Sequence, residues 1–346
     1  MAGSNPKVFV THSPVPEAVA ELKKHFDVEV WEKPTPPSKS VLKKKAATHA
    51  ALLTQTYDLI DEEVLVGAKE LKVVANRGAT FDNINVAAAT SRGILVATTP
   101  DLHQETCADM TFGLILAAAR RIALADRHVR AEQGAASDQT SYLGMDVHGK
   151  TLGIVGLGRI GMAVARRSIG FDMRVLYNSR VRNQDSESMM RIDWTFGLQP
   201  LLAESDFVSL HVPLTDKTRY MIGRRELKLM QPTSILVNTS HSAVVDNDAL
   251  CEALTERRIA GAALDVSDPE AIPSGHPLLG MDNVVLSPHI ADASAATFRK
   301  MSMLVVQNII AALNGDAIPS CVNPEVLNSG TKVTDITRKH RTRKKK

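Results

Sequence analysis

The sequence predicts an α/β protein made of two domains, each built on a doubly wound parallel sheet. Short apolar segments alternate with amphipathic segments along most of the 346 residues, and this alternation implies parallel strands joined by right-handed crossovers. A glycine-rich turn near the middle of the chain follows one apolar segment and precedes a helix-forming one. The length allows two domains with hydrophobic cores of their own.

The first part of the chain is expected to form one α/β unit. Apolar segments predict strands at residues 7–10, 28–31, 50–53, 71–75 and 94–96. Apolar residues at helical spacing predict helices at residues 17–25, 40–47 and 61–66. The strand near residue 96 closes this unit.

The pattern then changes to one long alanine-rich helix, residues 102–132, which we expect to connect the domains and to offer a dimer contact. A polar loop follows as far as residue 149. Six strands come next, the number that a doubly wound nucleotide-binding fold needs, at residues 151–155, 174–177, 206–210, 234–237, 259–264 and 284–286. A final helix, residues 293–313, ends at an Asn-Gly stop signal, and residues 319–327 are expected to return to the first unit.

The glycine-rich turn has the spacing Gly-x-Gly-x-x-Gly over residues 156–161. Gly156 permits the tight turn, Gly158 lets backbone amides approach a pyrophosphate, and Gly161 allows close packing of helix on strand. Arg159 and Ile160 lie at the helix N-terminus, where unpaired N–H groups and the helix dipole favour an anion. The central domain is therefore expected to bind a dinucleotide as a Rossmann domain does.

The segment after the second strand of this domain indicates which nicotinamide nucleotide is bound. Ser179, Arg180 and Arg182 follow that strand, and no carboxylate occurs before Asp185. NAD-binding domains use an acidic residue here for the ribose hydroxyls, whereas arginine forks suit a 2′-phosphate. We expect NADP(H) to be preferred and NAD(H) to be possible, although the arginines could instead lie on a solvated loop.

Composition narrows the other partners. The formal net charge of +3 depends on the last nine residues, which carry seven positive charges. This tail is either a solvated disordered end or a patch for nuclear localisation or non-specific polyanion contact. Three scattered cysteines predict neither disulfides nor a metal cluster. With no signal sequence or membrane-length apolar run, a cytoplasmic protein is expected.

The ordered motifs resemble those of the D-isomer-specific 2-hydroxyacid dehydrogenase family, in particular its glyoxylate and hydroxypyruvate reductases. They lie at residues 156–161, 205–208, 211–215, 243–246, 261–266 and 287–290. The resemblance implies a Rossmann cofactor domain, residues 101–293, inserted in a split flavodoxin-like substrate domain, residues 1–100 plus 294–330. Residues 331–346 would be a basic tail. It also implies a homodimer and the reduction of a small 2-oxoacid by hydride from nicotinamide.

The resemblance also assigns roles to single residues. His289 matches the acid/base histidine that protonates the new alkoxide, and Glu270 matches its carboxylate partner, although Ala271 stands where the family has proline. Asp265 matches a position near the nicotinamide. The remaining cofactor positions that fit the family pattern are Val212, Pro213, Asn238 and Thr239.

Four substrate positions depart from the family pattern. His241 stands where the family has the arginine that binds the substrate carboxylate, Ala79 and Thr80 replace Val-Gly, and Asp292 introduces a carboxylate. One interpretation is a changed pocket, in which Arg77 binds the carboxylate or Asp292 recognises a cationic or neutral carbonyl compound. Arg77 could equally be an exposed loop residue. The other interpretation is a relative that binds the cofactor but serves a structural or redox-sensing role.

Overall fold

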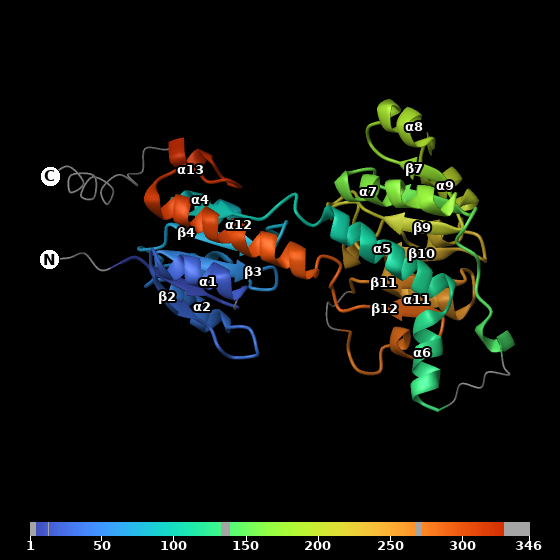
Figure 1. Ribbon diagram of the computed structural model, residues 1–346, viewed down its shortest axis with the longest axis horizontal. Helices are drawn as coiled ribbons and strands as arrows, with labels where there is room; N and C mark the ends of the chain where they lie inside the picture. The colour runs from blue at the N-terminus through green and yellow to red at the C-terminus, as the bar shows by residue number, and fades with distance from the viewer. Residues whose placement is uncertain (1–4, 13, 133–138, 268–271, 329–346) are drawn as a thin grey trace. The chain divides into compact units, whose positions relative to one another are not determined.

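The computed structural model describes residues 5–12, 14–132, 139–267 and 272–328. The chain forms two compact units (Figure 1). One unit combines Met1–His103 with Ser294–Lys346, and the other is Gln104–Ala293. Each contains an all-parallel sheet, so the predicted α/β class is confirmed.

The first unit is a five-stranded sheet in the order β2-β1-β3-β4-β5. Its strands are β1 (Lys7–Val10), β2 (Asp27–Val30), β3 (Ala51–Gln55), β4 (Val73–Arg77) and β5 (Leu95–Ala97). Its helices are α1 (Pro16–Lys23), α2 (Lys39–Ala46), α3 (Glu62–Leu65), α4 (Val86–Ser91), α12 (Ala295–Asn314) and α13 (Glu325–Asn328). Helices α1 and α12 bury their apolar residues on one face, and α2, α3 and α4 cover the other.

The C-terminal part of the described chain is tied to this first sheet. The side chain of Asn323 is fully buried; its Oδ1 accepts a bond from the Val96 amide at 2.7 Å, and its Nδ2 donates to the Ile94 carbonyl at 2.9 Å. The prediction that residues 319–327 return to the first unit is therefore confirmed.

The second unit is a seven-stranded sheet in the order β12-β11-β10-β9-β6-β7-β8. The strands are β6 (Thr151–Val155), β7 (Arg174–Asn178), β8 (Ile192–Trp194), β9 (Phe207–Leu210), β10 (Ile235–Asn238), β11 (Gly261–Leu264) and β12 (Val284–Leu286). The chain runs outward from β6 to β8, returns to β9 beside β6, and then runs outward the other way to β12. The carboxyl ends of β6 and β9 therefore flank a topological switch point, where open α/β sheets bind ligands.

Helices cover both faces of the second sheet. They are α5 (Gln104–Ala119), α6 (Ile122–Arg130), α7 (Arg159–Ser168), α8 (Gln184–Met190), α9 (Leu198–Glu204), α10 (Arg224–Leu227) and α11 (Asn247–Thr255). Short 3₁₀ turns lie at Gln139–Tyr142, Ile169–Phe171, Ser242–Val244 and Pro277–Gly280. Helices α5 and α7 pack on one face, and α9, α10 and α11 pack on the other.

Two expectations for this unit were wrong. The sheet has a seventh strand, β8, which spans only three residues and has too short an apolar pattern to be recognised. The single long helix is in fact two, because Arg121 adopts a left-handed conformation with φ 54° between α5 and α6. The amide of Met145 donates to the Ala119 carbonyl at 2.9 Å, so a distant segment completes the bonding at the end of α5.

The three cysteines, Cys107, Cys251 and Cys321, are free thiols. Burial raises the pKa of all three, that of Cys107 to about 12. At neutral pH these groups are protonated and poorly nucleophilic.

Among the described residues, no helix is both long and apolar enough to cross a membrane.

Candidate cofactor and active site

The glycine turn between β6 and α7 has the geometry that close approach of a ligand requires. Gly156 has φ +98°, and a Cβ there would lie 2.6 Å from the His211 carbonyl oxygen. A Cβ on Gly161 would lie 2.2 Å from the Gly156 carbonyl oxygen, whereas one on Gly158 would meet open space. Because Gly158 is also the N-cap of α7 and provides no side-chain cap, the turn fits the pyrophosphate of a dinucleotide.

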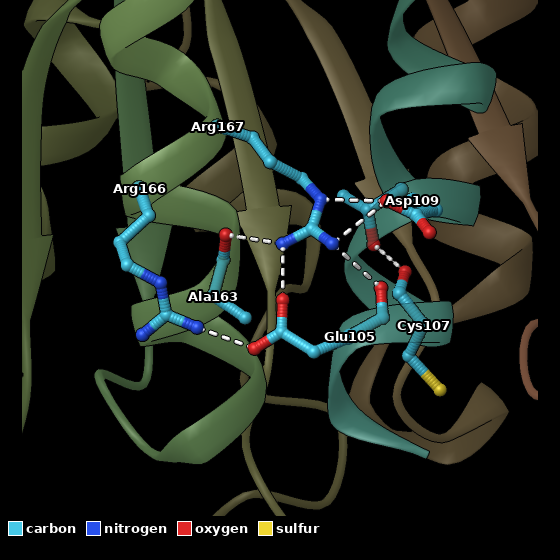
Figure 2. A network of polar contacts seen from close by, with 7 residues as sticks. Glu105, Cys107, Asp109, Ala163, Arg166 and Arg167 are labelled. Carbon is cyan, nitrogen blue, oxygen red and sulfur yellow. Dashed lines mark hydrogen bonds and ion pairs between the residues drawn. The ribbon is translucent and has the colours of Figure 1, made fainter.

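Ion pairs between charged side chains connect helix α7 to α5, and Figure 2 shows this network from close by. The Arg167 guanidinium donates to the Glu105 carboxylate at 2.9 Å and to Asp109 at 2.8 Å. Arg166 contacts the other Glu105 oxygen. The helix that begins at the glycine turn is thereby held against α5 within the second unit.

The segment after β7 borders a cavity of about 600 Å³ next to the glycine turn. Leu157 from the turn, and Ser179 and Arg182 from the segment, line it. Arg180 is exposed and forms no hydrogen bond or ion pair with the described residues. Arg182 forms an ion pair with Glu187, a partner that the sequence analysis did not identify. The segment thus offers two guanidinium groups where the adenosine ribose of a dinucleotide would bind.

The segment after β9 packs on the glycine turn from the switch-point side. His211 donates its amide to the Val155 carbonyl at 2.8 Å, and its Nε2 lies 2.8 Å from the Ser209 hydroxyl. Its Nδ1 is enclosed and has no hydrogen-bond partner among the described residues. Burial lowers the pKa of His211 to about 3, so the ring is neutral at physiological pH. Val212 and Pro213 follow it at the same edge.

The segment after β12 carries His289 and is held by Asp265, the residue that follows β11. The buried Asp265 carboxylate accepts bonds from the Ser287 hydroxyl at 2.6 Å and from the amides of Ile290 and Ala291 at 3.0 and 2.8 Å. The His289 amide donates to the Asp265 carbonyl at 2.8 Å. His289 is exposed and has φ 54°. Asp265 therefore fixes the backbone on both sides of the histidine.

The segment after β10 carries His241 and is held by the buried residue Asn238. The Asn238 amide group donates to the His241 carbonyl at 2.9 Å, and its Oδ1 accepts from the amide and the hydroxyl of Ser240 at 3.0 and 2.9 Å. Thr239 connects this segment to α5, because its hydroxyl lies 3.0 Å from that of Thr111. Asn238 and Thr239 thus position His241 at the carboxyl end of the sheet.

The candidate substrate residues of the first unit lie at the carboxyl end of β4. Arg77, the last residue of β4, is half-buried; its Nε donates to Gln55 Oε1 at 2.6 Å, and its guanidinium stacks 4.2 Å from the Phe298 ring centroid. Arg77 is therefore not an exposed loop residue. The Asn76 side chain donates to the Thr80 carbonyl at 2.9 Å, which fixes the loop that contains Ala79 and Thr80.

Comparison with known proteins decides the family. The family model described as "D-isomer specific 2-hydroxyacid dehydrogenase, NAD binding domain" matches residues 112–291. The chain belongs to the D-isomer specific 2-hydroxyacid dehydrogenase family. It is 47% identical over 323 residues to the glyoxylate reductase of Korarchaeum cryptofilum, covering 93% of this chain and 97% of that protein. The second unit of this dehydrogenase-family protein contains the Rossmann NAD-binding domain.

Similarity to solved structures supports the same assignment. A protein from Thermus thermophilus has a TM-score of 0.86 and 39% identity, covering 91% of this chain and 99% of that one. An NADPH-dependent glyoxylate/hydroxypyruvate reductase from Sinorhizobium meliloti, solved with NADP and malonate, has a TM-score of 0.80 and 29% identity. That likeness covers 92% of this chain and 97% of the Sinorhizobium protein.

Of the two carboxylate residues expected beside His289 and the substrate in this dehydrogenase-family site, Glu270 and Asp292, the structure describes only Asp292. Glu270, the expected partner of His289, lies outside the described residues, as does Ala271. Asp292 is half-buried and forms no hydrogen bond or ion pair with the described residues. The described segments that follow β10, β11 and β12, residues 239–245, 265–267 and 287–293, contain no lysine or arginine. These described segments therefore carry two carboxylates, Asp265 and Asp292, and no permanently cationic side chain.

Proposed function

We propose that this protein is an NADPH-preferring reductase of a small 2-oxoacid or a related carbonyl compound, similar to glyoxylate and hydroxypyruvate reductases. The observation that carries this proposal is the rigid placement of His289. Asp265 fixes its loop at the same sheet edge that carries the glycine turn. When bound, the nicotinamide nucleotide supplies a hydride to the carbonyl carbon.

In this proposal His289 provides the proton. Its imidazolium form donates a proton to the oxyanion that develops on the substrate, and its exposed position allows the ring to be reprotonated from solvent. Glu270 is proposed to orient the ring and raise its basicity. Asp265 acts as a positioning residue for His289 and is also proposed to lie near the nicotinamide.

Substrate binding is proposed to differ from that of typical relatives. A histidine at position 241 presents at most two diverging donors, whereas an arginine would present a permanently charged fork. Arg77, with Ala79 and Thr80 beside it, is proposed to bind the substrate carboxylate. The alternative proposal is that Asp292 recognises a cationic or neutral carbonyl compound, because like charges at a binding site oppose an anionic one.

Cofactor preference is proposed to depend on Ser179, Arg180 and Arg182. The three follow β7, and Ser179 and Arg182 border the cavity next to the glycine turn. Arginine forks bind phosphate by charge-assisted hydrogen bonds. Titration with NADPH and NADH tests the proposal. We expect tighter binding of NADPH, and equal or tighter binding of NADH would contradict it.

A second candidate function is that of an impaired homologue, a structural or redox-sensing protein that binds NADP(H). The residues that favour it are His241 and Asp292. With His241 at the family's arginine position, the described segments after β10, β11 and β12 contain no lysine or arginine, and Asp292 adds a negative charge. Turnover of NADPH with glyoxylate, hydroxypyruvate, bulkier 2-oxoacids and neutral aldehydes separates the two. A reductase turns over at least one of them and loses that activity in His289→Ala. Bound NADPH without turnover on any of them favours the impaired homologue.

A homodimer is also proposed, with contacts near α6. Ile122 and Val129 on this helix are 54% and 67% exposed, and the nearby Leu143 is 70% exposed. Large apolar side chains that are exposed close together are typical of an interface. Val129→Glu should shift the protein towards monomer in light scattering, whereas the same change at the equally apolar but distant Met189 should not.

A further inference from the structure

The segment after β7 contains an arginine whose orientation is fixed by a carboxylate from the following helix. Arg182 Nε lies 2.9 and 3.1 Å from the two Glu187 oxygens, and Nη2 lies 2.8 Å from Oε2. Glu187 therefore occupies the edge of the guanidinium formed by Nε and Nη2. A guanidinium has five N–H donors, so the edge formed by its two terminal nitrogens keeps a pair of donors.

Glu187 is itself anchored to the sheet. The hydroxyl of Tyr177, whose side chain is fully buried in β7, donates to Glu187 Oε1 at 2.7 Å. The same hydroxyl accepts a bond from the Asn183 amide at 2.8 Å. The Arg182 guanidinium and the Tyr177 hydroxyl hold the pKa of Glu187 below its usual range, so the carboxylate is ionised at neutral pH. The anchor thus extends from the strand to the arginine.

The same guanidinium lies over an aromatic ring. Arg182 Cζ lies 5.5 Å from the Trp194 ring centroid, within the range of a cation–π contact. Carboxylate and indole together restrict a side chain that is otherwise half exposed. An arginine that is already ordered loses less conformational entropy when it binds a ligand.

We propose that Glu187 is a positioning residue for the 2′-phosphate of the cofactor: anchored by Tyr177, it holds one edge of Arg182 so that the opposite edge binds the phosphate. Arg182 lines the cavity beside Leu157 of the glycine turn, which places its guanidinium at the ribose position of a dinucleotide. This inference rests on the proposed preference for NADPH. It assigns to Glu187 an orienting role, although its charge alone would repel a phosphate.

Binding of two adenosine nucleotides tests the inference without any reaction. Adenosine 2′,5′-bisphosphate carries the 2′-phosphate, and 5′-AMP lacks it. Arg182→Ala should weaken binding of the bisphosphate by about 10- to 100-fold, since hydrogen bonds to charged groups contribute about 1.5–3 kcal/mol. It should leave the affinity for 5′-AMP unchanged. Glu187→Ala should weaken the bisphosphate about tenfold, with Glu187→Gln between it and the wild type.

The double variant Arg182→Ala/Glu187→Ala provides the sharpest readout. If Glu187 acts through Arg182, the double variant binds the bisphosphate no more weakly than Arg182→Ala alone. The control is Glu204→Ala, which removes another exposed ion pair of this unit, 2.9 Å from Arg174, and should change neither nucleotide.

Several results would overturn the inference. Tighter bisphosphate binding in Glu187→Ala would show that the carboxylate only repels phosphate. Equal weakening of both nucleotides would show a general structural role, and additive losses in the double variant would show independent action. Wild-type protein that binds both nucleotides equally would refute the NADPH preference as well. Wild-type discrimination that persists in Glu187→Ala would refute this inference alone.

Discussion

His289 follows β12 and His241 follows β10 at the carboxyl edge of the same sheet, on either side of β11. The segment of His289 is held by a buried residue that follows the adjacent strand β11, whereas the segment of His241 is held by the last residue of its own strand, β10. Asp265 holds the segment of His289 through three bonds to its carboxylate, and His289 itself has φ 54°. Asn238 holds the segment of His241 through the His241 carbonyl, and His241 has φ −133° in extended backbone.

The two histidine positions differ in the residue types that their backbone conformations favour. A left-handed residue that is not glycine is uncommon, and asparagine, aspartate and histidine are the side chains most often found there. Position 289 is therefore restricted by both conformation and chemistry. Position 241 uses an extended conformation that any residue adopts, and its backbone carbonyl forms the bond to Asn238. The backbone conformation at position 241 thus does not restrict the residue type.

The largest effect is expected at His289. His289→Asn keeps a residue that tolerates the left-handed conformation and removes the titrating group, so turnover should fall by about 10²–10⁴-fold. Steady-state rates with the best substrate measure the loss, and NADP⁺ binding should stay within about twofold because the helix N-terminus and glycine turn are untouched. Unchanged turnover would remove His289 from the mechanism. The exposed His148, which pairs with Asp172, is the control: His148→Asn should have no effect.

The second effect tests the tolerance of position 241. Removing one partner of a buried charged pair typically costs about 2–5 kcal/mol, so restoring it in His241→Arg should raise kcat/KM for glyoxylate by roughly 30-fold to several thousand-fold if carboxylate binding limits the wild type. The thermal midpoint should change little, because the segment is held through the backbone. An unchanged rate would indicate that Asp292, Ala79 or Thr80 blocks the substrate, and His241→Arg combined with Asp292→Ser would then separate the first from the other two.

The third effect concerns the two anchoring residues. Asp265→Asn places an amide N–H₂ group against a backbone N–H or the Ser287 hydroxyl, so at least one bond to a charged acceptor is lost, with a cost of about 1.5–3 kcal/mol. Chemical denaturation measures the loss. Turnover should fall as well, because the backbone of His289 loses its support. Asn238→Asp, the reciprocal change at an equally buried position, should destabilise the fold without changing the pH profile of the reaction, and a shifted profile would contradict the separation of the two segments.

The sequence predicted those parts of the site that depend on local backbone constraints. The glycine turn is an example, since Gly156 has a positive φ of +98° and Gly161 approaches the carbonyl oxygen of Gly156, five residues earlier. The number of strands was underestimated because β8 is short, and the helix break at Arg121 was missed because a carbonyl of α5 bonds to Met145 from a later segment.

Partners that are remote in sequence could not be predicted. The donors that reach Asp265 are 22, 25 and 26 residues away along the chain. The resemblance placed this aspartate near the nicotinamide but gave no sign that its carboxylate holds the loop of His289. Glu187 is only five residues from Arg182, yet their pairing depends on the position of α8, which carries Glu187, and on the Tyr177 hydroxyl. No periodic pattern contains that information.

The smallest effect concerns His211, a third histidine at this edge, which contrasts with the other two because its ring is enclosed and neutral. Its folded-state pKa of about 3 lies below the unfolded value of 6.5, so the unfolded chain gains a proton that the folded chain does not. Stability from this group is complete above pH 6.5 and falls as the pH decreases, by about 1.4 kcal/mol per pH unit and about 2 kcal/mol in total at pH 5. A glutamine at position 211 in His211→Gln can still bond to the Ser209 hydroxyl but cannot titrate. Between pH 7 and pH 5 the free energy of unfolding of the wild type should therefore fall by about 2 kcal/mol more than that of His211→Gln. Parallel pH profiles for the two proteins in urea titrations would show that the His211 ring is protonated in the folded state and is not a buried neutral group.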